Sequence, residues 1–180
     1  MLRSVRKVSA GNARLWMRRQ QLQQVRFITD SYTSHLQRQD SAFDNLKTTV
    51  LAYADGASRG NPGRSGCGAL LVDPTTREVI ASSTMYVGDR ETNNAAEYHG
   101  LLLALRLAQQ HQVTNVHVHM DSQLIVRQMQ GQYRVKAANL RVLYQQCKDM
   151  SAALGHVTFS YVARAENSAA DRLANEAIDA

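Results

Sequence analysis

The stretch TVLAYADGASRGNPGRSGCGALLV, residues 49–72, decides the architecture of this chain. It opens with an apolar, strand-like run at 49–55 that ends in an acid, and it closes with a second apolar run at 67–72. Between these runs, residues 56–66 are rich in glycine and contain Asn-Pro, a composition that favours turns. The pattern therefore predicts two strands, joined by a turn that spans 56–66.

Downstream of this hairpin, the apolar period changes from that of strands to that of helices and back. A third strand at 78–87, after a turn at 73–76, completes an antiparallel meander. The other expected elements are helices at 94–110, 122–129, 137–154 and 168–178, and strands at 115–120 and 157–162. Three antiparallel strands followed by βαβ units predict an α/β fold of the mixed α+β kind, in which helices pack on a mixed sheet.

The composition indicates one globular domain behind a basic segment. Of the 180 residues, 44% are hydrophobic and 20% charged, which excludes a disordered or fibrous chain. The net charge of +6 arises in residues 1–47, which hold 9 basic and 3 acidic side chains, whereas residues 48–180 hold 12 of each. The basic character is therefore no sign that the folded part binds nucleic acid. No run of about 18 apolar residues occurs, so we expect no membrane span.

The segment before the predicted domain has the composition of a targeting sequence. Residues 1–29 contain seven basic side chains and no acid, and their apolar residues are spaced so that a helix would have one apolar face. This composition is typical of a mitochondrial transit peptide, and residues 30–47 are interpreted as a linker. The alternative is a basic arm that adds nonspecific affinity for phosphate backbones in a nuclear or cytoplasmic protein.

Four acidic residues stand at the ends or beginnings of the expected elements. Asp55 and Asp121 end strands, and Glu97 and Asp171 lie in the first turns of helices. Each alone fits a solvated surface group or a favourable contact with a helix dipole, but in an open sheet all four would converge at one end. Converging carboxylates need a cation, and oxygen ligands suit Mg²⁺, with Mn²⁺ as the other option. Two such ions about 4 Å apart can clamp both the attacking and the leaving oxygen of a phosphodiester.

Four motifs, in order and spacing, carry a resemblance to a known family. They are DGASRGNPG at 55–63, TNNAAEY at 92–98, DSQ at 121–123 and ADRLAN at 170–175. Together they resemble the type 1 ribonuclease H family over about residues 48–180. RAEN at 164–167 makes the chain more similar to the short bacterial and archaeal forms, which lack a basic handle.

This resemblance implies a ribonuclease H-like fold, with a five-stranded mixed sheet of order 3-2-1-4-5. It implies a Mg²⁺-dependent endonuclease that cleaves the RNA strand of an RNA–DNA hybrid and leaves 3′-hydroxyl and 5′-phosphate ends. Asp55, Glu97, Asp121 and Asp171 match the catalytic tetrad that holds two metal ions, with Asp55 as the bridging ligand. The expected partner is the hybrid, with no small-molecule cofactor, and the protein is expected to be a monomer.

The matched positions also supply groups that could recognise a hybrid. Hydrogen bonds to 2′-hydroxyls distinguish a hybrid from duplex DNA. The residues assigned to minor-groove contacts are Ser58, Gly60, Asn61, Asn94 and Gln123, and Thr92 matches a position that helps to hold a DNA phosphate. Asn61 also suits a turn, and Asn94 a helix cap, and these roles are compatible with binding.

The chain departs from many relatives in two places. Tyr161 stands near the position of a mobile histidine thought to shuttle protons, and no histidine follows residue 157. Arg164 matches an arginine of the short forms, so we expect it to contact the scissile phosphate or the product; Glu166 is a weaker candidate for proton transfer. The basic handle is reduced to residues 130–136, which carry two positive charges.

Two other functions fit the same fold. One is a noncatalytic module that binds hybrids, although the intact set of four acids argues against it. The other is a related nuclease that acts on double-stranded RNA or on RNA–DNA junctions.

Overall fold

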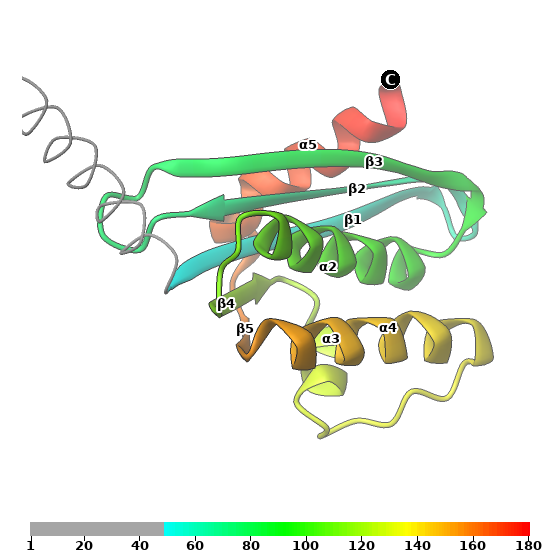
Figure 1. The fold of residues 1–180 in the computed structure, drawn as a ribbon. Coiled ribbons are helices and arrows are strands. Elements are labelled where there is room, and N and C mark those ends of the chain that lie inside the picture. Colours follow the sequence, from blue (N-terminus) through cyan, green and yellow to red (C-terminus); the bar gives the residue numbers. More distant parts are fainter. Residues whose placement is uncertain (1–48) are drawn as a thin grey trace, which may run out of the picture. The chain divides into compact units, whose positions relative to one another are not determined.

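The computed structural model describes residues 49–180 (Figure 1). The expected transit peptide, 1–29, and linker, 30–47, lie outside the described residues. In the described part of the chain, no helix is long and apolar enough to cross a membrane.

Five strands form one mixed sheet of order β3-β2-β1-β4-β5. They are β1 (Val50–Gly60), β2 (Gly63–Val72), β3 (Val79–Glu91), β4 (Asn115–Met120) and β5 (His156–Tyr161). Neighbours are antiparallel in β1–β2 and β2–β3, and parallel in β1–β4 and β4–β5. The predicted order and the mixed character of the sheet are confirmed.

Helices cover both faces of the sheet. They are α2 (Asn93–Gln110), α3 (Gln123–Met129), α4 (Ala138–Leu154) and α5 (Ser168–Asp179), the last preceded by a short 3₁₀ turn, η1 (Arg164–Asn167). Figure 1 shows α2 and α5 on opposite faces. Accordingly, Cys67 and Ala69 of β2 belong to the core cluster that contains the leucines of α2, whereas Leu70 and Val72, which alternate with them, pack with Ala170 of α5.

The glycine-rich segment differs from the prediction in extent. The turn is confined to Asn61 and Pro62, because β1 continues to Gly60 and β2 begins at Gly63. Gly60, with a positive φ of 104°, and Gly63 flank the turn, whereas Gly56 and Gly68 serve helix packing. A Cβ on Gly56 would lie 2.0 Å from the carbonyl carbon of Ala96, and a Cβ on Gly68 would lie 2.4 Å from Cβ of Leu173. The missing side chains let α2 and α5 lie directly on the strands that carry the motif.

The buried core is mostly apolar, and a polar side-chain contact within it links α2 to α3. Tyr98 of α2 is fully buried and donates a hydrogen bond from its hydroxyl to Oε1 of Gln128 on α3, at 2.7 Å. Cys67 and Cys147 are buried free thiols, and burial raises the pKa of each to about 12. Both cysteines belong to the hydrophobic core.

Candidate active site

Asp55 and Asp121 lie side by side in the sheet because β1 and β4 are parallel. The paired register runs from Val50–Val116 to Tyr53–His119, and each acid stands two residues beyond that last pair. Asp121 follows the end of β4, as predicted. Asp55, however, lies within β1 and not at its end, because the ladder with β2 continues through Gly60. What ends near Asp55 is the pairing with β4, and this opens one side of β1 to the site.

Two helices bring the other two acids to the same place. Asp171 lies in the first turn of α5, as predicted. Glu97 does not lie in the first turn of α2, because the helix begins at Asn93 and Glu97 is its fifth residue. The close contact between Gly56 and the backbone of Ala96 and Glu97 brings this second turn onto β1.

All four acids line one pocket with a volume of about 260 Å³. The other lining residues are Gly56, Ala57, Ser58, Asn93, Arg164 and Asn175. Among the predicted substrate contacts, Ser58 is therefore in the pocket, whereas Gly60, Asn61, Thr92, Asn94 and Gln123 are not among its lining residues. These five belong to the hairpin tip and to the starts of α2 and α3.

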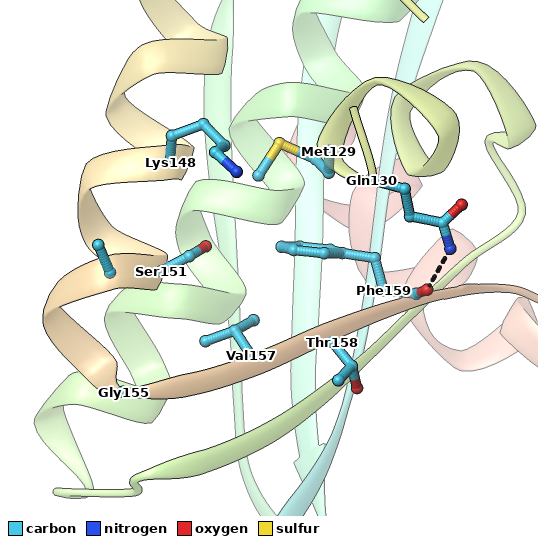
Figure 2. Close-up of a pocket in the computed structure, with 9 residues that line it drawn as sticks. Met129, Gln130, Lys148, Ser151, Gly155, Val157, Thr158 and Phe159 are labelled. Atoms are coloured by element: carbon cyan, nitrogen blue, oxygen red, sulfur yellow. Dashed lines mark hydrogen bonds between the residues drawn. The ribbon is translucent and has the colours of Figure 1, made fainter. Parts of the chain in front are cut away.

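A larger hollow of about 520 Å³ lies elsewhere, between α3, α4 and β5 (Figure 2). Phe159 and Met129 reach into it, and Gln130 donates a hydrogen bond from Nε2 to the carbonyl oxygen of Phe159, at 2.8 Å. Lys148 is the one charged side chain in its lining, which contains no carboxylate. Its chemistry does not match the cation site that the sequence predicts.

Burial and mutual repulsion raise the pKa values of two of the acids. Asp55 is 8% exposed, and burial, followed by the charge of Asp121, raises its pKa to about 7. The pKa of Glu97 is likewise raised to about 7, first by burial and then by Asp121. A divalent cation in the pocket would remove both penalties, and the donor set consists of the hard oxygens that Mg²⁺ prefers.

The arrangement suits ions that are each held by few protein ligands. Within residues 49–180, no group of three or more His, Cys, Asp or Glu side chains is arranged to hold an ion. Mg²⁺ is commonly bound by one or two carboxylates, with water and substrate phosphate oxygens completing its coordination. The four carboxylates around one pocket supply oxygen ligands of the kind that a divalent cation takes.

Glu97 and Asp121 are each held by neutral donors, one on the same helix as Glu97 and the others on neighbouring segments. Glu97 accepts hydrogen bonds from Nδ2 of Asn93, at 3.1 Å, and from Oγ of Ser122, at 2.5 Å. Ser122 precedes α3 but makes no side-chain cap, because its hydroxyl bonds Glu97. Asp121 accepts from Nδ2 of Asn167, at 2.7 Å.

Asp171 is held by Arg164 and Asn175. Arg164 forms an ion pair with its Oδ1 at 2.9 Å, and Nδ2 of Asn175 lies 3.4 Å from its Oδ2. The side chain of Arg164 is 79% exposed. Its guanidinium therefore lies at the solvent side of the pocket, and N–H groups that do not bond Asp171 remain available as donors. Glu166 lies outside the pocket lining and accepts from the backbone N–H of Ala163, at 3.3 Å.

The hairpin tip and the start of α2 are joined, and together they present the predicted substrate contacts. Oδ1 of Asn61 accepts from the backbone N–H of Asn93, at 3.2 Å, and Oγ of Ser58 donates to the carbonyl oxygen of Glu91, at 3.0 Å. Thr92 is the N-cap of α2, since its Oγ1 accepts from the backbone N–H of Ala95, at 3.2 Å. The capping role considered for Asn94 is therefore wrong.

Three amide side chains of the site lie beyond the sequence-based prediction of site residues. Asn93 and Asn175 stand four residues from Glu97 and Asp171 on the same helix, a spacing that could have revealed them. Asn167 contacts an acid 46 residues away in the sequence, and no local pattern indicates that contact.

Comparison with known proteins places this site in a family. A family profile described as "Reverse transcriptase-like" matches residues 53–177. The N-terminal ribonuclease H domain of Rv2228c from Mycobacterium tuberculosis aligns at 43% identity with a TM-score of 0.70, over 73% of this chain and 94% of that one. RNase H1 from Halobacterium salinarum aligns at 36% identity with a TM-score of 0.70, over 73% of this chain and 98% of that one. The chain belongs to the type 1 ribonuclease H family.

A third type 1 ribonuclease H, LC11-RNase H1, has been solved in complex with an RNA/DNA hybrid. It aligns at 38% identity with a TM-score of 0.68, over 72% of this chain and 96% of that one. The chain spans 36% of the length of the mycobacterial relatives that it matches at 44% identity, among them the bifunctional protein Rv2228c. The shared region is therefore the ribonuclease H domain.

Proposed function

We propose that the domain at 48–180 hydrolyses the RNA strand of RNA–DNA hybrids and leaves 3′-hydroxyl and 5′-phosphate ends. The observation that carries the proposal is the meeting of Asp55, Glu97, Asp121 and Asp171, from four different elements, in one pocket. Relatives named ribonuclease H support the reaction, and the hybrid complex of LC11-RNase H1 supports the substrate.

The four carboxylates would hold two Mg²⁺ ions, with Mn²⁺ as a substitute. When bound, the ions supply the positive charge that activates water and stabilises the leaving oxygen. Asp55 is suited to the shared ligand because it is nearly buried and lies in a strand paired on both sides up to Tyr53. The raised pKa values of Asp55 and Glu97 make cation binding release protons near neutral pH.

Arg164 would contact the scissile phosphate or the product. Its guanidinium is mostly exposed, and it is anchored by the bond to Asp171, so remaining N–H groups can donate to phosphate oxygens. The same bond raises the pKa of Arg164, which keeps the charge in place at any physiological pH. Glu166 stays a weaker candidate for proton transfer.

The hybrid would lie across the hairpin tip and the start of α2. Ser58, Gly60, Asn61, Asn94 and Gln123 would contact its minor groove, where 2′-hydroxyls donate and accept hydrogen bonds. Thr92 would hold a DNA phosphate. Its Oγ1 accepts the capping bond, so its hydroxyl proton is available to the phosphate, and the N-terminus of α2 favours negative charge.

One cleavage assay tests the proposal. The full chain is incubated with hybrid labelled on the RNA strand, with and without Mg²⁺, beside Asp121→Asn and beside Asp149→Asn, a matched change at an exposed site on α4. We expect Mg²⁺-dependent cleavage by the wild type and by Asp149→Asn alone. Binding without cleavage by the wild type would instead indicate a noncatalytic hybrid-binding module. Equal cleavage of duplex RNA would indicate a nuclease with another substrate.

We further propose that residues 1–29 direct the protein to mitochondria and that the domain acts as a monomer. The support for targeting is the run of seven basic residues without an acid. A fluorescent protein fused behind residues 1–47 should enter mitochondria, whereas the same fusion with the seven basic residues changed to glutamine should stay in the cytosol. Cytosolic fluorescence from both fusions would contradict targeting.

A further inference from the structure

Asn167 is a buried amide at the point where three acid-bearing elements meet. Its side chain is fully buried, and it ends η1 directly before α5. Nδ2 donates two hydrogen bonds, to Oδ1 of Asp121 at 2.7 Å and to the carbonyl oxygen of Ala54 at 3.0 Å. Both neighbours are acceptors only, so the chemistry fixes which end of the amide faces them.

These two bonds link the side chain of Asp121 to the backbone next to Asp55. Ala54 directly precedes Asp55 in β1, and Asp171 follows Asn167 by four residues at the start of α5. The ladder between β1 and β4 has its last pair at Tyr53–His119. Beyond that pair, the amide of Asn167 joins β1 to Asp121.

The other end of the amide argues against a purely packing role. Oδ1 of Asn167 is buried and has no hydrogen-bond partner among residues 49–180. A buried acceptor without a donor lowers the stability of the folded state, and an apolar side chain of similar size would avoid that cost. The position therefore favours an amide for what its Nδ2 group does.

We propose that Asn167 is a positioning residue for the cation site, acting through Asp121 and Ala54 without touching substrate. It sets the separation of Asp55 and Asp121 and orients Oδ1 of Asp121, so that the oxygens facing the pocket are arranged for divalent ions before the ions bind. The inference rests on the proposed metal-dependent function.

The test compares Asn167→Ala with Gln128→Ala in the full chain. Both changes remove a buried amide that takes part in a side-chain hydrogen bond, but Gln128 bonds Tyr98, away from the acids. Binding of Mg²⁺ alone is measured by isothermal titration calorimetry, without hybrid, and the metal-free Tm is measured for each protein. We expect both variants to have a lower Tm. We expect Asn167→Ala to bind Mg²⁺ at least tenfold more weakly, and Gln128→Ala to stay within about twofold of the wild type.

The outcomes separate this inference from the proposed function. No Mg²⁺ binding by the wild type would overturn the metal site itself. Mg²⁺ binding by the wild type and by folded Asn167→Ala with the same Kd would overturn only the role of Asn167. If Asn167→Ala does not fold, the side-chain amide signals of Asn167 are followed by NMR in ¹⁵N-labelled wild type. They should shift as Mg²⁺ saturates the site, and signals that do not respond would contradict the inference.

Discussion

Ser122, at the end of β4, donates a hydrogen bond from its Oγ to Oε2 of Glu97 on α2, with 2.5 Å between the oxygens. The bond acts against burial and against Asp121, which together raise the pKa of Glu97 to about 7. The hydroxyl of Ser122, the residue directly before α3, thus favours the ionised form of the Glu97 carboxyl.

Ser122→Ala should shift the pH dependence of activity to higher pH. Loss of the donor raises the pKa of Glu97 further, so at neutral pH more of this carboxyl is protonated and unable to bind a cation. A hydrogen bond to a charged group contributes about 1.5–3 kcal/mol, which corresponds to a shift of roughly one to two pH units. The measurement is kcat/KM for a labelled hybrid between about pH 5 and about pH 9 at fixed Mg²⁺. Ser122→Thr keeps the hydroxyl and should keep the wild-type profile; identical profiles for all three proteins would refute the role of this bond.

Asp55→Asn should stabilise the metal-free protein while abolishing cleavage. The pKa of Asp55 is raised from 3.8 to about 7, so the folded state binds its proton more tightly than the unfolded state does. The stability of the metal-free wild type therefore falls as pH rises from about 4 to about 7 and stays low above that. At about pH 8 the neutral amide removes this penalty, which is on the order of a few kcal/mol. The measurement is the free energy of unfolding in urea at about pH 4 and about pH 8, without metal. A wild type that is no less stable at the higher pH would contradict the prediction.

The topology could be predicted because the strands and helices have distinct apolar periods. The alternation at 115–120 and the helical spacing at 94–110 place β4 and α2 almost at their observed bounds. The hairpin was predicted less well. Gly56 and Gly66 were expected in a turn, yet they are strand residues whose missing side chains make room for helices distant in the sequence. Local composition cannot tell these two uses of glycine apart.

Asp121 and Asp171 stand where the sequence indicates, at the end of β4 and in the first turn of α5, whereas Asp55 lies within β1 and Glu97 in the second turn of α2. The meeting of the four acids could still be predicted, because their motifs match those of a known family in order and spacing. Their supporting donors depend on tertiary contacts. Ser122 and Asn167 reach acids 25 and 46 residues away, and a residue's local sequence carries no sign of such partners. The raised pKa of Asp55 similarly follows from burial, which exists only in the folded chain.

Gly56→Ala should disrupt the site from within the core. The added Cβ would lie 2.0 Å from the carbonyl carbon of Ala96 and 2.2 Å from the backbone nitrogen of Glu97, so α2 must move away from β1 and take Glu97 with it. Backbone overlap of this kind costs at least about 1–3 kcal/mol. The measurements are Tm, which should fall, and the Kd for Mg²⁺, which should rise. The control is Gly131→Ala, where no atom lies within 4 Å of the new Cβ and the positive φ of 76° adds strain of about 1 kcal/mol. If Gly56→Ala lowered stability no more than Gly131→Ala does, the close contact would not matter.

Arg164→Ala should reduce turnover without a matching loss of stability. The side chain of Arg164 is 79% exposed, so its ion pair with Asp171 contributes at most about 1 kcal/mol to folding. Loss of its donors to the phosphate should lower kcat by roughly tenfold to a hundredfold, and Arg164→Lys should recover part of it, since the charge returns without the planar guanidinium. The matched control is Arg172→Ala. Arg172 is 72% exposed, pairs with Glu176 at 3.6 Å and does not line the pocket. The measurements are steady-state kinetics on a labelled hybrid and the Tm of each variant. Equal losses of kcat in Arg164→Ala and Arg172→Ala would show that the effect comes from general surface charge and not from contact with the phosphate.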